Sequence, residues 1–351
     1  MRDRSAVGCA ADMVGTEDRD TPWLSILLPA YNVAPFAQQC LESIIGQSDE
    51  GVEIIVCEDC STDDTLEVLE RIREAHRGRF SIMTNERNRG QSFARNRLLD
   101  AARGDYIWFL DADDYLVPGA IASIDKQVRL NRPDMIGGDY RKRKLPKNGF
   151  SGPKGRLLTD RDAIVGGICK SRKMYVWLRI CKRELWGDDI RFPDGKLFED
   201  VAVVPWLALR ATSMIHLPRA LLEYRIHLGS SLSAVTRVKN VFNHERHRDL
   251  ALALEGFPEA LRQLPETSLA EARFGVSHFI AMEFTKLCER IAEAGKDGCG
   301  VQDLGSLARD FREGMEANSP IPFNTLKNLY VRRLRLISWY KLKRALDFAA
   351  A

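Results

Sequence analysis

Short apolar runs alternate with amphipathic segments over the first 140 residues. The runs are continuous and brief, which predicts β-strands buried on both faces. They lie at Leu24–Leu28, Val52–Cys57, Phe80–Thr84, Tyr106–Leu110 and Met135–Tyr140. Segments with apolar residues on one helical face predict helices between them, at Pro35–Gln47, Asp63–His76, Gln91–Ala102 and Pro118–Leu130. This alternation predicts an α/β fold with a mostly parallel sheet and right-handed crossover connections.

The rest of the chain has a different pattern. Residues 160–235 have mixed character and are rich in Trp and Arg, and from about residue 236 long Ala, Leu, Glu and Arg stretches predict helices. The sequence has no run of about 18 apolar residues, so we expect no transmembrane helix. The first twenty residues carry charges throughout and lack the apolar core of a secretory signal, so we expect a flexible leader over residues 1–22.

A basic stretch interrupts the α/β pattern. Residues 141–156 contain seven Lys and Arg side chains and no acid, together with several Pro and Gly residues. We expect a loop here. It is either a solvated connection or a cationic rim that faces an anionic ligand or a lipid head group.

Charge and cysteine usage narrow the class of protein. The 351 residues include 52 basic and 49 acidic side chains, a formal net charge of +3, so no overall charge favours binding to nucleic acid. The eight cysteines are scattered and no export signal precedes them, so we expect reduced thiols in a cytoplasmic protein. Cys57 and Cys60 form a lone CxxC motif without the second pair that a zinc site usually needs.

Acidic residues follow three of the first four predicted strands. Asp59 follows the second strand, Glu86 the third, and Asp111 and Asp113 the fourth. Ligands bind outside the carboxyl ends of the strands in such sheets, so we expect these acids at one ligand-binding edge. Their oxygens suit Mg²⁺ or Mn²⁺. Arg95 lies one turn into the next helix and is placed to pair with phosphate. A solvated turn for the acids and a surface salt bridge for Arg95 are the simpler alternatives.

Six blocks in this order and spacing resemble the family 2 glycosyltransferases with the GT-A fold. The blocks are SILLPAYN, EIIVCEDCSTDDT, NRGQSFARNRLLDAARGDYIWFLDADD, VWLRICKRELW, IRFPDGKLFEDVAVV and LEYRIHLGSSLS. The resemblance covers about residues 24–235 and implies a GT-A domain over residues 23–235, with a helical C-terminal region over 236–351. It divides the domain into a nucleotide-sugar half, residues 23–140, and a half for the acceptor and catalytic base, residues 141–235.

The resemblance also implies roles for individual residues. The donor-binding positions are Pro29, Ala30, Tyr31, Asp59, Arg95, Asp111, Asp113 and His227. Among them, Asp59 matches the contact to the uracil base, Asp111 the position near the ribose, and Asp113 the ligand of a divalent metal. Asp200 matches the catalytic base, with Glu199 as its neighbouring support. His227 is left open between a metal ligand, a phosphate donor and a packed loop residue.

Two residues depart from the family pattern. Glu58 stands where the family often has Asp, and Cys60 stands where it often has Gly. We expect Cys60 to adjust a turn without a catalytic role.

The implied activity is an inverting transfer. A sugar passes from a nucleotide-sugar donor to a hydroxyl of a growing saccharide in surface or exopolysaccharide biosynthesis. The donor that the resemblance implies is a UDP-sugar. Mg²⁺ or Mn²⁺ assists, and the acceptor is expected to be lipid-linked. One alternative is a nucleotidyltransferase acting on a sugar phosphate, although a Gly-rich loop would then follow the first strand. The other alternative is a non-catalytic membrane-surface protein on a transferase-like fold.

The C-terminal segment over residues 325–347 carries seven basic residues and one acid, with apolar and aromatic residues between them. A basic, aromatic, amphipathic helix is typical of an interfacial membrane anchor. It would place the protein peripherally at the inner face of the cytoplasmic membrane. The alternative is a helix packed on the catalytic domain with a cationic outer face.

Overall fold

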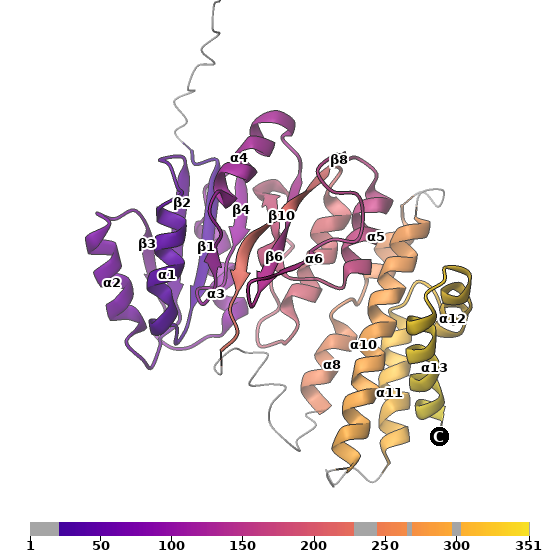
Figure 1. Ribbon diagram of the computed structural model, residues 1–351. Helices are drawn as coiled ribbons and strands as arrows, with labels where there is room; N and C mark the ends of the chain where they lie inside the picture. The colour runs from indigo at the N-terminus through magenta and orange to yellow at the C-terminus, as the bar shows by residue number, and fades with distance from the viewer. Residues whose placement is uncertain (1–20, 228–243, 265–268, 297–302, 351) are drawn as a thin grey trace, which may run out of the picture.

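A central twisted sheet with helices on both faces continues into a group of C-terminal helices (Figure 1). The computed structural model describes residues 21–227, 244–264, 269–296 and 303–350. Residues 1–20 of the expected leader lie outside these ranges.

The sheet has ten strands. They are β1 (Leu24–Ala30), β2 (Val52–Glu58), β3 (Ser81–Thr84), β4 (Tyr106–Phe109), β5 (Tyr115–Leu116), β6 (Met135–Lys142), β7 (Leu145–Lys147), β8 (Leu157–Leu158), β9 (Arg179–Lys182) and β10 (Met214–Tyr224). Their order is β3-β2-β1-β4-β9-β6-β10-β5, with β7 on β6 and β8 on β10. β1 pairs in parallel with β2 and β4, β2 with β3, and β6 with β10. β9 runs antiparallel between β4 and β6, so the sheet is mixed but parallel over β1–β4, and the predicted mostly parallel sheet is confirmed.

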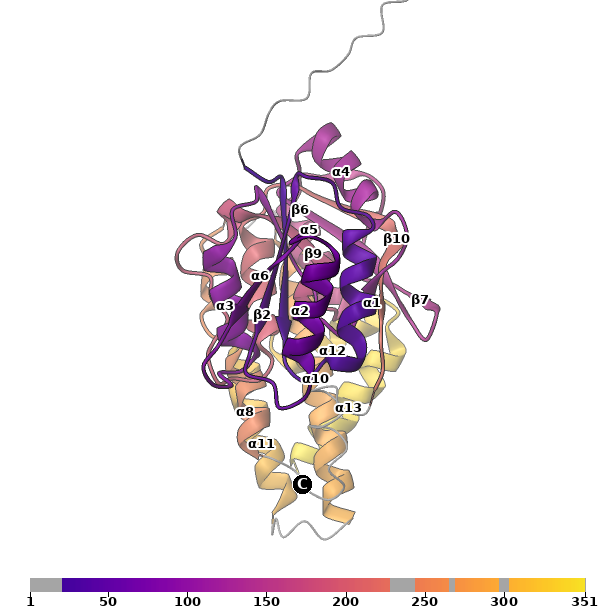
Figure 2. The same ribbon diagram turned by 90° about the vertical axis from the view of Figure 1, so that its left-hand side faces the viewer.

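The helices pack in two layers around this sheet. The α-helices are α1 (Ala34–Ile45), α2 (Thr65–Ala75), α3 (Gln91–Ala101), α4 (Ala120–Asn131), α5 (Arg161–Ser171), α6 (Glu199–Arg210), α8 (His244–Leu252), α9 (Phe257–Arg262), α10 (Ala270–Lys296), α11 (Leu304–Ala317), α12 (Phe323–Arg332) and α13 (Leu336–Ala350). α1, α2 and α4 share one hydrophobic core with the sheet, and α3, α5 and α6 share the other. Figure 2 shows α1 on one side of the sheet and α3 and α6 on the opposite side. The first four predicted strands and helices are confirmed to within a few residues at their ends.

Two expectations about basic segments are wrong in part. The stretch 141–156 begins not as a loop but as a hairpin, in which β7 pairs antiparallel with β6. Arg143 and Lys144 form its turn with φ of 53° and 61°.

The segment 325–347 is not one helix, because α12 ends at Arg332 and α13 begins at Leu336. Leu334 between them has a left-handed φ of 55°, which a continuous α-helix does not accommodate.

The C-terminal helices are joined to the α/β region by a close helix contact. α10 packs on α5 where Gly275 meets Gly166, and a Cβ on Gly275 would lie 2.7 Å from the Gly166 carbonyl oxygen. Only a residue without a Cβ permits that approach. One hydrophobic core therefore runs from the sheet through α5 and α6 into α10–α13. None of the helices in the described ranges combines the length and apolar character needed to cross a bilayer.

Candidate active site

The loop after β4 carries three acids on a short path. One carboxylate oxygen each from Asp111, Asp113 and Asp114 lies within 4.8 Å of the others. Asp114 is buried, and its Oδ1 accepts a 2.7 Å hydrogen bond from the Arg225 backbone N–H. Its Oδ2 is buried without a hydrogen-bond partner in the structure. Burial and the charges of the other two acids raise the pKa of Asp114 well above its usual value. The loop therefore concentrates negative charge that a cation would stabilise.

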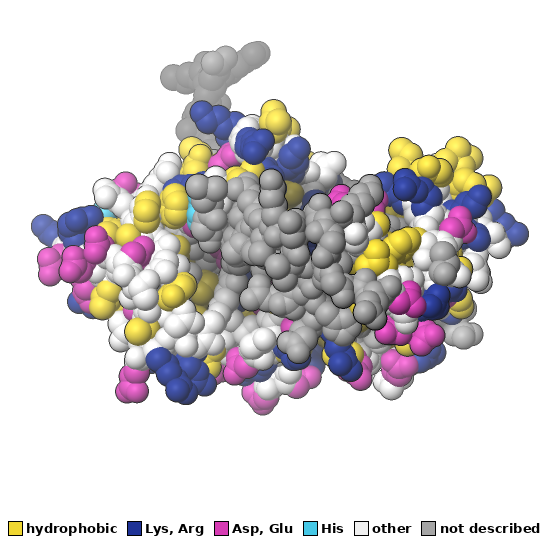
Figure 3. Space-filling model, turned by 90° about the horizontal axis from the view of Figure 1, so that it is seen from below, with side chains coloured by type: hydrophobic (Ala, Val, Ile, Leu, Met, Phe, Trp, Pro, Cys, Tyr) yellow, Lys and Arg dark blue, Asp and Glu magenta, His cyan; other side chains and the backbone are white. Residues whose placement is uncertain are grey.

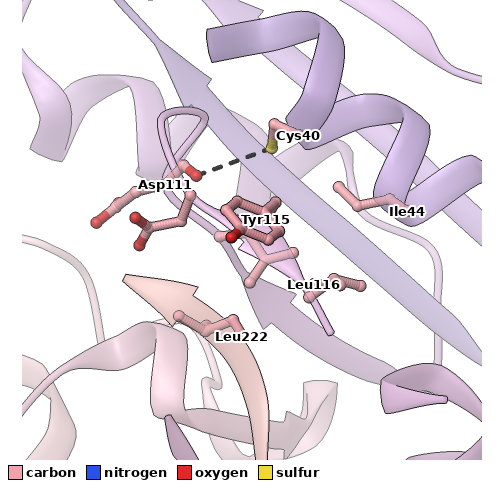
Figure 4. A pocket seen from close by; sticks show the side chains of 8 residues that line it. Cys40, Ile44, Asp111, Tyr115, Leu116 and Leu222 are labelled. Carbon is pink, nitrogen blue, oxygen red and sulfur yellow. Dashed lines mark hydrogen bonds between the residues drawn. The ribbon is translucent and has the colours of Figure 1, made fainter. Parts of the chain in front are cut away.

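A small apolar pocket backs this loop and explains the burial of its acids. Figure 4 shows the pocket with Asp111 on one side and Leu116, Leu222 and Ile44 on the other. The Cys40 thiol donates a long 3.9 Å hydrogen bond to the Asp111 carbonyl oxygen and fixes the loop from behind. Water is kept from the inner side of the acids, so the charge there is poorly solvated.

Arg95 connects the acidic loop to the start of α6. It is 1% exposed. Its Nη2 donates to Asp111 Oδ1 at 3.0 Å, and its Nη1 donates to Glu199 Oε1 and Asp200 Oδ1 at 2.9 Å each. Although burial alone would lower the pKa of Arg95, the three carboxylates raise it above its usual value. One buried guanidinium thus holds acids that are separated by about 90 residues along the chain.

Asp200 has the environment of a proton acceptor. It lies in the first turn of α6, which follows Phe198 with a left-handed φ of 62°. Its second oxygen, Oδ2, accepts from the Val176 backbone N–H at 3.2 Å. Burial raises the pKa of Asp200 to about 7, Glu199 and Asp111 add to the shift, and Arg95 opposes it. A carboxyl with a pKa near neutral pH is suited to general base catalysis.

His227 lies on the same acidic loop. Its Nε2 is 2.6 Å from Asp113 Oδ2, and its ring packs against Phe36 with centroids 4.4 Å apart. The neighbouring Arg225 places its guanidinium over the Phe36 ring at 4.9 Å. The segment after β10 therefore closes over the loop after β4. Ser230 and Ser231, in the same resembling block, lie outside the described residues.

Asp59 holds the loop before α3 in place at the same edge of the sheet. Its Oδ1 accepts from Asn85 Nδ2 at 2.6 Å and from the Arg89 N–H at 2.9 Å, and its Oδ2 accepts from the Gly90 N–H at 2.7 Å. Its own backbone N–H donates to the Ala30 carbonyl oxygen at 2.9 Å. Asp59 is thus fixed between the end of β1 and the loop before α3, and its carboxylate holds that loop.

The turn after β2 accounts for the two departures from the family pattern. Glu58 is buried and accepts from the backbone N–H groups of Cys60 and Ser61 at 3.1 and 2.6 Å. Cys60 has a left-handed φ of 57°, a conformation that favours glycine. Glu58 therefore stabilises a turn in which Cys60 occupies a position that favours glycine.

The structure gathers the predicted site residues into two adjoining sets. The first set comprises Arg95, Asp111, Asp113, Glu199, Asp200 and His227. Arg95 binds Asp111, Glu199 and Asp200, His227 contacts Asp113, and the neighbouring carboxylates of Asp111 and Asp113 connect the two groups. The second set lies at the ends of β1 and β2 and comprises Pro29, Ala30, Tyr31 and Asp59. Tyr31 is 42% exposed, whereas Ala30 and Asp59 are buried. Because β1, β2 and β4 are parallel neighbours, both sets lie at one edge of the sheet.

Sequence reasoning did not single out one residue of this site. Asp114 completes the acidic cluster, and its signal was its position in the run DADD directly after a buried strand. The family resemblance places Arg225 with His227 in a segment that closes over the diphosphate or acceptor, and in the structure the Arg225 backbone N–H donates to Asp114.

Comparisons with known proteins agree with this geometry. The family model "Glycosyl transferase family 2" matches residues 25–175. Glycosyltransferase GlyA of Streptococcus pneumoniae is 28% identical over 277 residues, which is 71% of this chain and 38% of that protein. Chondroitin synthase of Pasteurella multocida is 41% identical over 100 residues, which is 28% of this chain and 10% of that protein. The chain thus spans well under two thirds of these relatives.

Solved structures share the fold over nearly the whole chain. S. aureus TarS residues 1–349, in complex with UDP-GlcNAc, superposes with a TM-score of 0.65 at 19% identity. The superposition covers 93% of this chain and 89% of that one.

The fold is the GT-A fold, with acids at the carboxyl edge of its sheet. Residues 25–175 match glycosyltransferase family 2, and the chain resembles enzymes of bacterial polysaccharide synthesis. This assignment favours a glycosyltransferase over a nucleotidyltransferase.

Replacement of the buried arginine tests the central ion-pair cluster. We expect Arg95→Met to lower the free energy of unfolding by about 3–5 kcal/mol, because buried carboxylates lose their partner. Without Arg95 the pKa of Asp111 and Asp200 in the folded state rises further, so the variant's carboxyls lose their protons at higher pH than those of the wild type. The unfolded chain has already released these protons, so raising the pH from 6 to 8 favours unfolding of the variant more than unfolding of the wild type. The loss of stability in urea unfolding should therefore be larger at pH 8.

Arg103→Met is the matched control. Arg103 pairs with Glu53 but its side chain is 69% exposed, so we expect a loss under about 1 kcal/mol without pH dependence. Equal losses in the two variants, or a loss from Arg95→Met that is the same at both pH values, would contradict the cluster's role.

Proposed function

We propose that the protein is an inverting hexosyltransferase that uses a UDP-sugar donor. The acceptor is a hydroxyl of a growing, lipid-linked saccharide in surface or exopolysaccharide biosynthesis. The observation that carries the proposal is the double contact of Arg95, which holds the acid after β4 and the acid at the start of α6 on one side chain. The proposed donor site and the proposed base are therefore close enough to contact the donor sugar and the acceptor at the same time. The UDP-GlcNAc complex of the TarS neighbour supports the choice of donor class.

The acidic loop suits a divalent cation. Asp113 is proposed as the ligand of Mg²⁺ or Mn²⁺, assisted by Asp111 and Asp114. Hard carboxylate oxygens are the ligands these ions prefer. The partnerless Asp114 Oδ2 and the crowding of three acids both favour a cation there. When bound, the ion would stabilise the negative charge that develops on the leaving diphosphate. His227 then orients Asp113 through their contact.

Asp200 is proposed as the general base. The acceptor hydroxyl is a poor nucleophile, and a carboxylate that accepts its proton as attack proceeds lowers the barrier. The Val176 N–H and Arg95 fix the two oxygens of Asp200, so the proton-accepting atom keeps its direction. Glu199 supports this arrangement by sharing Nη1 of Arg95. One base without a covalent sugar intermediate yields inversion.

The ends of β1 and β2 are proposed to hold the nucleotide. Pro29, Ala30 and Tyr31 line it, and Asp59 contacts the uracil base from a position that three donors have fixed. Residues 23–140 form the nucleotide-sugar half and residues 141–235 the acceptor half, followed by the helical region over 236–351.

An exposed elbow between α12 and α13 is proposed to touch an anionic lipid surface. We define the C-terminal elbow as residues 331–340. Its exposed apolar side chains are Val331 (47%), Leu334 (84%), Leu336 (58%), Ile337 (77%) and Tyr340 (54%). Exposed cations accompany them: Arg332 lies within the elbow, and Lys341 and Arg344 follow it. Figure 3 shows hydrophobic and basic side chains together at the end formed by the C-terminal helices. Apolar side chains flanked by cations suit the interface of an anionic membrane.

The elbow replaces the predicted amphipathic helix in this proposal. Arg333 pairs with Glu271 at 2.8 Å, and Arg335 Nη1 is 3.1 Å from His278 Nε2, so these two cations bind other parts of the protein. The cysteines among the described residues are unpaired, which agrees with a reducing, cytoplasmic location at the inner face of the membrane.

The metal role of Asp113 is tested by Asp113→Asn. We expect the variant to lose the Mn²⁺-dependent part of UDP binding, because an amide is a poor ligand for a hard cation. Isothermal titration of UDP with and without Mn²⁺ measures this. Asp125→Asn, a surface acid paired with Arg129, is the control and should bind as the wild type does. Undiminished Mn²⁺-dependent binding by Asp113→Asn would exclude this assignment.

The role of Asp200 is tested by Asp200→Asn. Turnover of UDP-sugar should fall on the order of 10²-fold or more, the scale of general base catalysis, while UDP binding is retained. In the wild type, kcat/KM should rise about tenfold per pH unit below about pH 7 and then level off, because the base acts only when deprotonated. Asp188→Asn, an exposed acid, is the control. Full turnover by Asp200→Asn would refute the role.

The elbow is tested by flotation with vesicles of phosphatidylglycerol and phosphatidylcholine. The double variant Leu334→Asp with Ile337→Asp should lose binding, because it places charge where apolar side chains would enter the interface. Leu130→Asp replaces a comparably exposed leucine (67%) on α4 and should float as the wild type does. Equal flotation of the double variant and the wild type would show that the C-terminal elbow does not bind the lipid surface.

A further inference from the structure

Three aromatic rings form a stacked ladder beside the site. The centroids of Tyr175 and Trp177 are 4.7 Å apart with planes 7° apart, and those of Trp177 and Tyr224 are 5.8 Å apart with planes 15° apart. Tyr140 meets Trp177 edge-on at 5.2 Å and fixes it from below. Trp177 is 3% exposed, while Tyr175 and Tyr224 are half-buried and keep surface available to a ligand. The ladder is therefore rigid and partly open.

The ladder extends from the proposed base to the acidic loop. At one end, Tyr175 precedes Val176, whose backbone N–H donates to Asp200. At the other end, Tyr224 precedes Arg225, whose backbone N–H donates to Asp114. The electrostatic surroundings agree: burial chiefly raises the pKa of both tyrosines, and Asp200 contributes at Tyr175 and Asp114 at Tyr224. A sugar on the ladder would thus lie between the base and the donor, where the acceptor must be.

Two lysines without acidic partners stand over the ladder. Lys142 Nζ is 5.1 Å from the centroid of the Tyr224 ring, and Lys173 Nζ is 5.8 Å from that of Tyr175. Within the described ranges, the structure records no carboxylate within ion-pair distance of either amine. Burial first, and then the charges of Lys286, Arg172 and Lys142, lower the pKa of Lys173.

Glu283, whose charge acts on Lys173, is already paired with two other cations. It accepts from Arg172 at 2.6 Å and from Lys286 at 2.9 Å. Lys142 and Lys173 are half-buried, and neither has a direct ion-pair partner among the described residues. Like charges held together there destabilise one another, so an anion would relieve the repulsion.

We propose that Tyr175, Trp177 and Tyr224, with Lys142 and Lys173, form an acceptor subsite for a saccharide that carries an acidic group, phosphate or carboxylate. The exposed parts of the Tyr175 and Tyr224 side chains take a sugar ring, as aromatic side chains do in ligand sites. The two amines take the anion, since Lys binds such groups as a compact point charge. This inference rests on the proposed function, because it assigns the acceptor of the same reaction.

The subsite gives a reason for part of the basic stretch after β6. Lys142 is the last residue of β6, and the pairing of β6 with β10 places it opposite Tyr224 at the end of the ladder. The stretch includes another lysine, Lys154, which is bound to Asp139 at 2.7 Å and is thus committed to the fold. Only part of the stretch is therefore available as a cationic rim.

The test is binding of defined saccharides to the full chain in the presence of UDP and Mn²⁺. The probes are a glucuronate-containing oligosaccharide, a phosphorylated oligosaccharide and a neutral oligosaccharide of the same length, measured by calorimetry. We expect the wild type to bind at least one acidic probe tenfold or more tighter than the neutral one. The tighter of the two acidic probes tells phosphate from carboxylate.

The double variant Lys142→Gln with Lys173→Gln should lose tenfold or more of that affinity while its affinity for UDP is unchanged. Lys147→Gln, an exposed lysine of the same hairpin, is the control and should keep it. Tyr175→Leu should weaken the neutral and acidic probes alike, because it removes an open ring and no charge. UDP binding and thermal unfolding of each variant report whether the fold and the donor site are intact.

Three results would overturn the proposal: equal binding of acidic and neutral probes, no binding of either acidic probe at millimolar concentration, or undiminished binding by the double lysine variant. Loss of UDP affinity in that variant would assign the lysines to the donor instead and overturn it as well. If the wild type itself bound no UDP, the proposed function would fail, which separates the two failures.

Discussion

The buried guanidinium of Arg95 is the interaction on which the site depends. A buried cation needs acceptors or opposite charges around it, and Arg95, with 1% exposure, has three carboxylates from the loop after β4 and from the first turn of α6. Three carboxylates against one arginine leave negative charge in excess. Burial chiefly raises the pKa of Asp200 to about 7, and the excess negative charge adds to this shift and favours a divalent cation at the neighbouring acids.

Other parts of the fold follow from this cluster. The apolar pocket behind the loop and the Cys40 contact keep the acids desolvated, so that their charges interact strongly. The contact of Val176 with Asp200 ties the base to the turn that carries Tyr175 and Trp177. The acidic loop, Asp200 and the aromatic ladder are therefore connected through hydrogen bonds. A displacement of one of them would displace the others.

The C-terminal region shows how composition can mislead. The seven basic residues of 325–347 predict one basic face on one helix. Arg333 and Arg335 do not belong to such a face, because they pack over the Phe274 ring of α10 at 4.0 and 5.6 Å. The apolar residues divide likewise, since Leu326 and Tyr330 are core while Leu334 and Ile337 are exposed. Charge counts do not distinguish these cases, because the direction of a side chain depends on the helix against which it packs.

The sequence by itself determined the first four strands and helices, because buried parallel strands need continuous apolar runs and their helices need one apolar face. It also predicted the edge where Asp59, Asp111 and Asp113 meet, since that follows from strand direction alone. Only the tertiary structure decided that Arg95 bridges Asp111 and Asp200 and that Asp114 joins the acidic cluster. The contact of Arg95 with Asp200 joins residues 105 positions apart along the chain, and no local pattern encodes which distant groups the packing brings within hydrogen-bond reach.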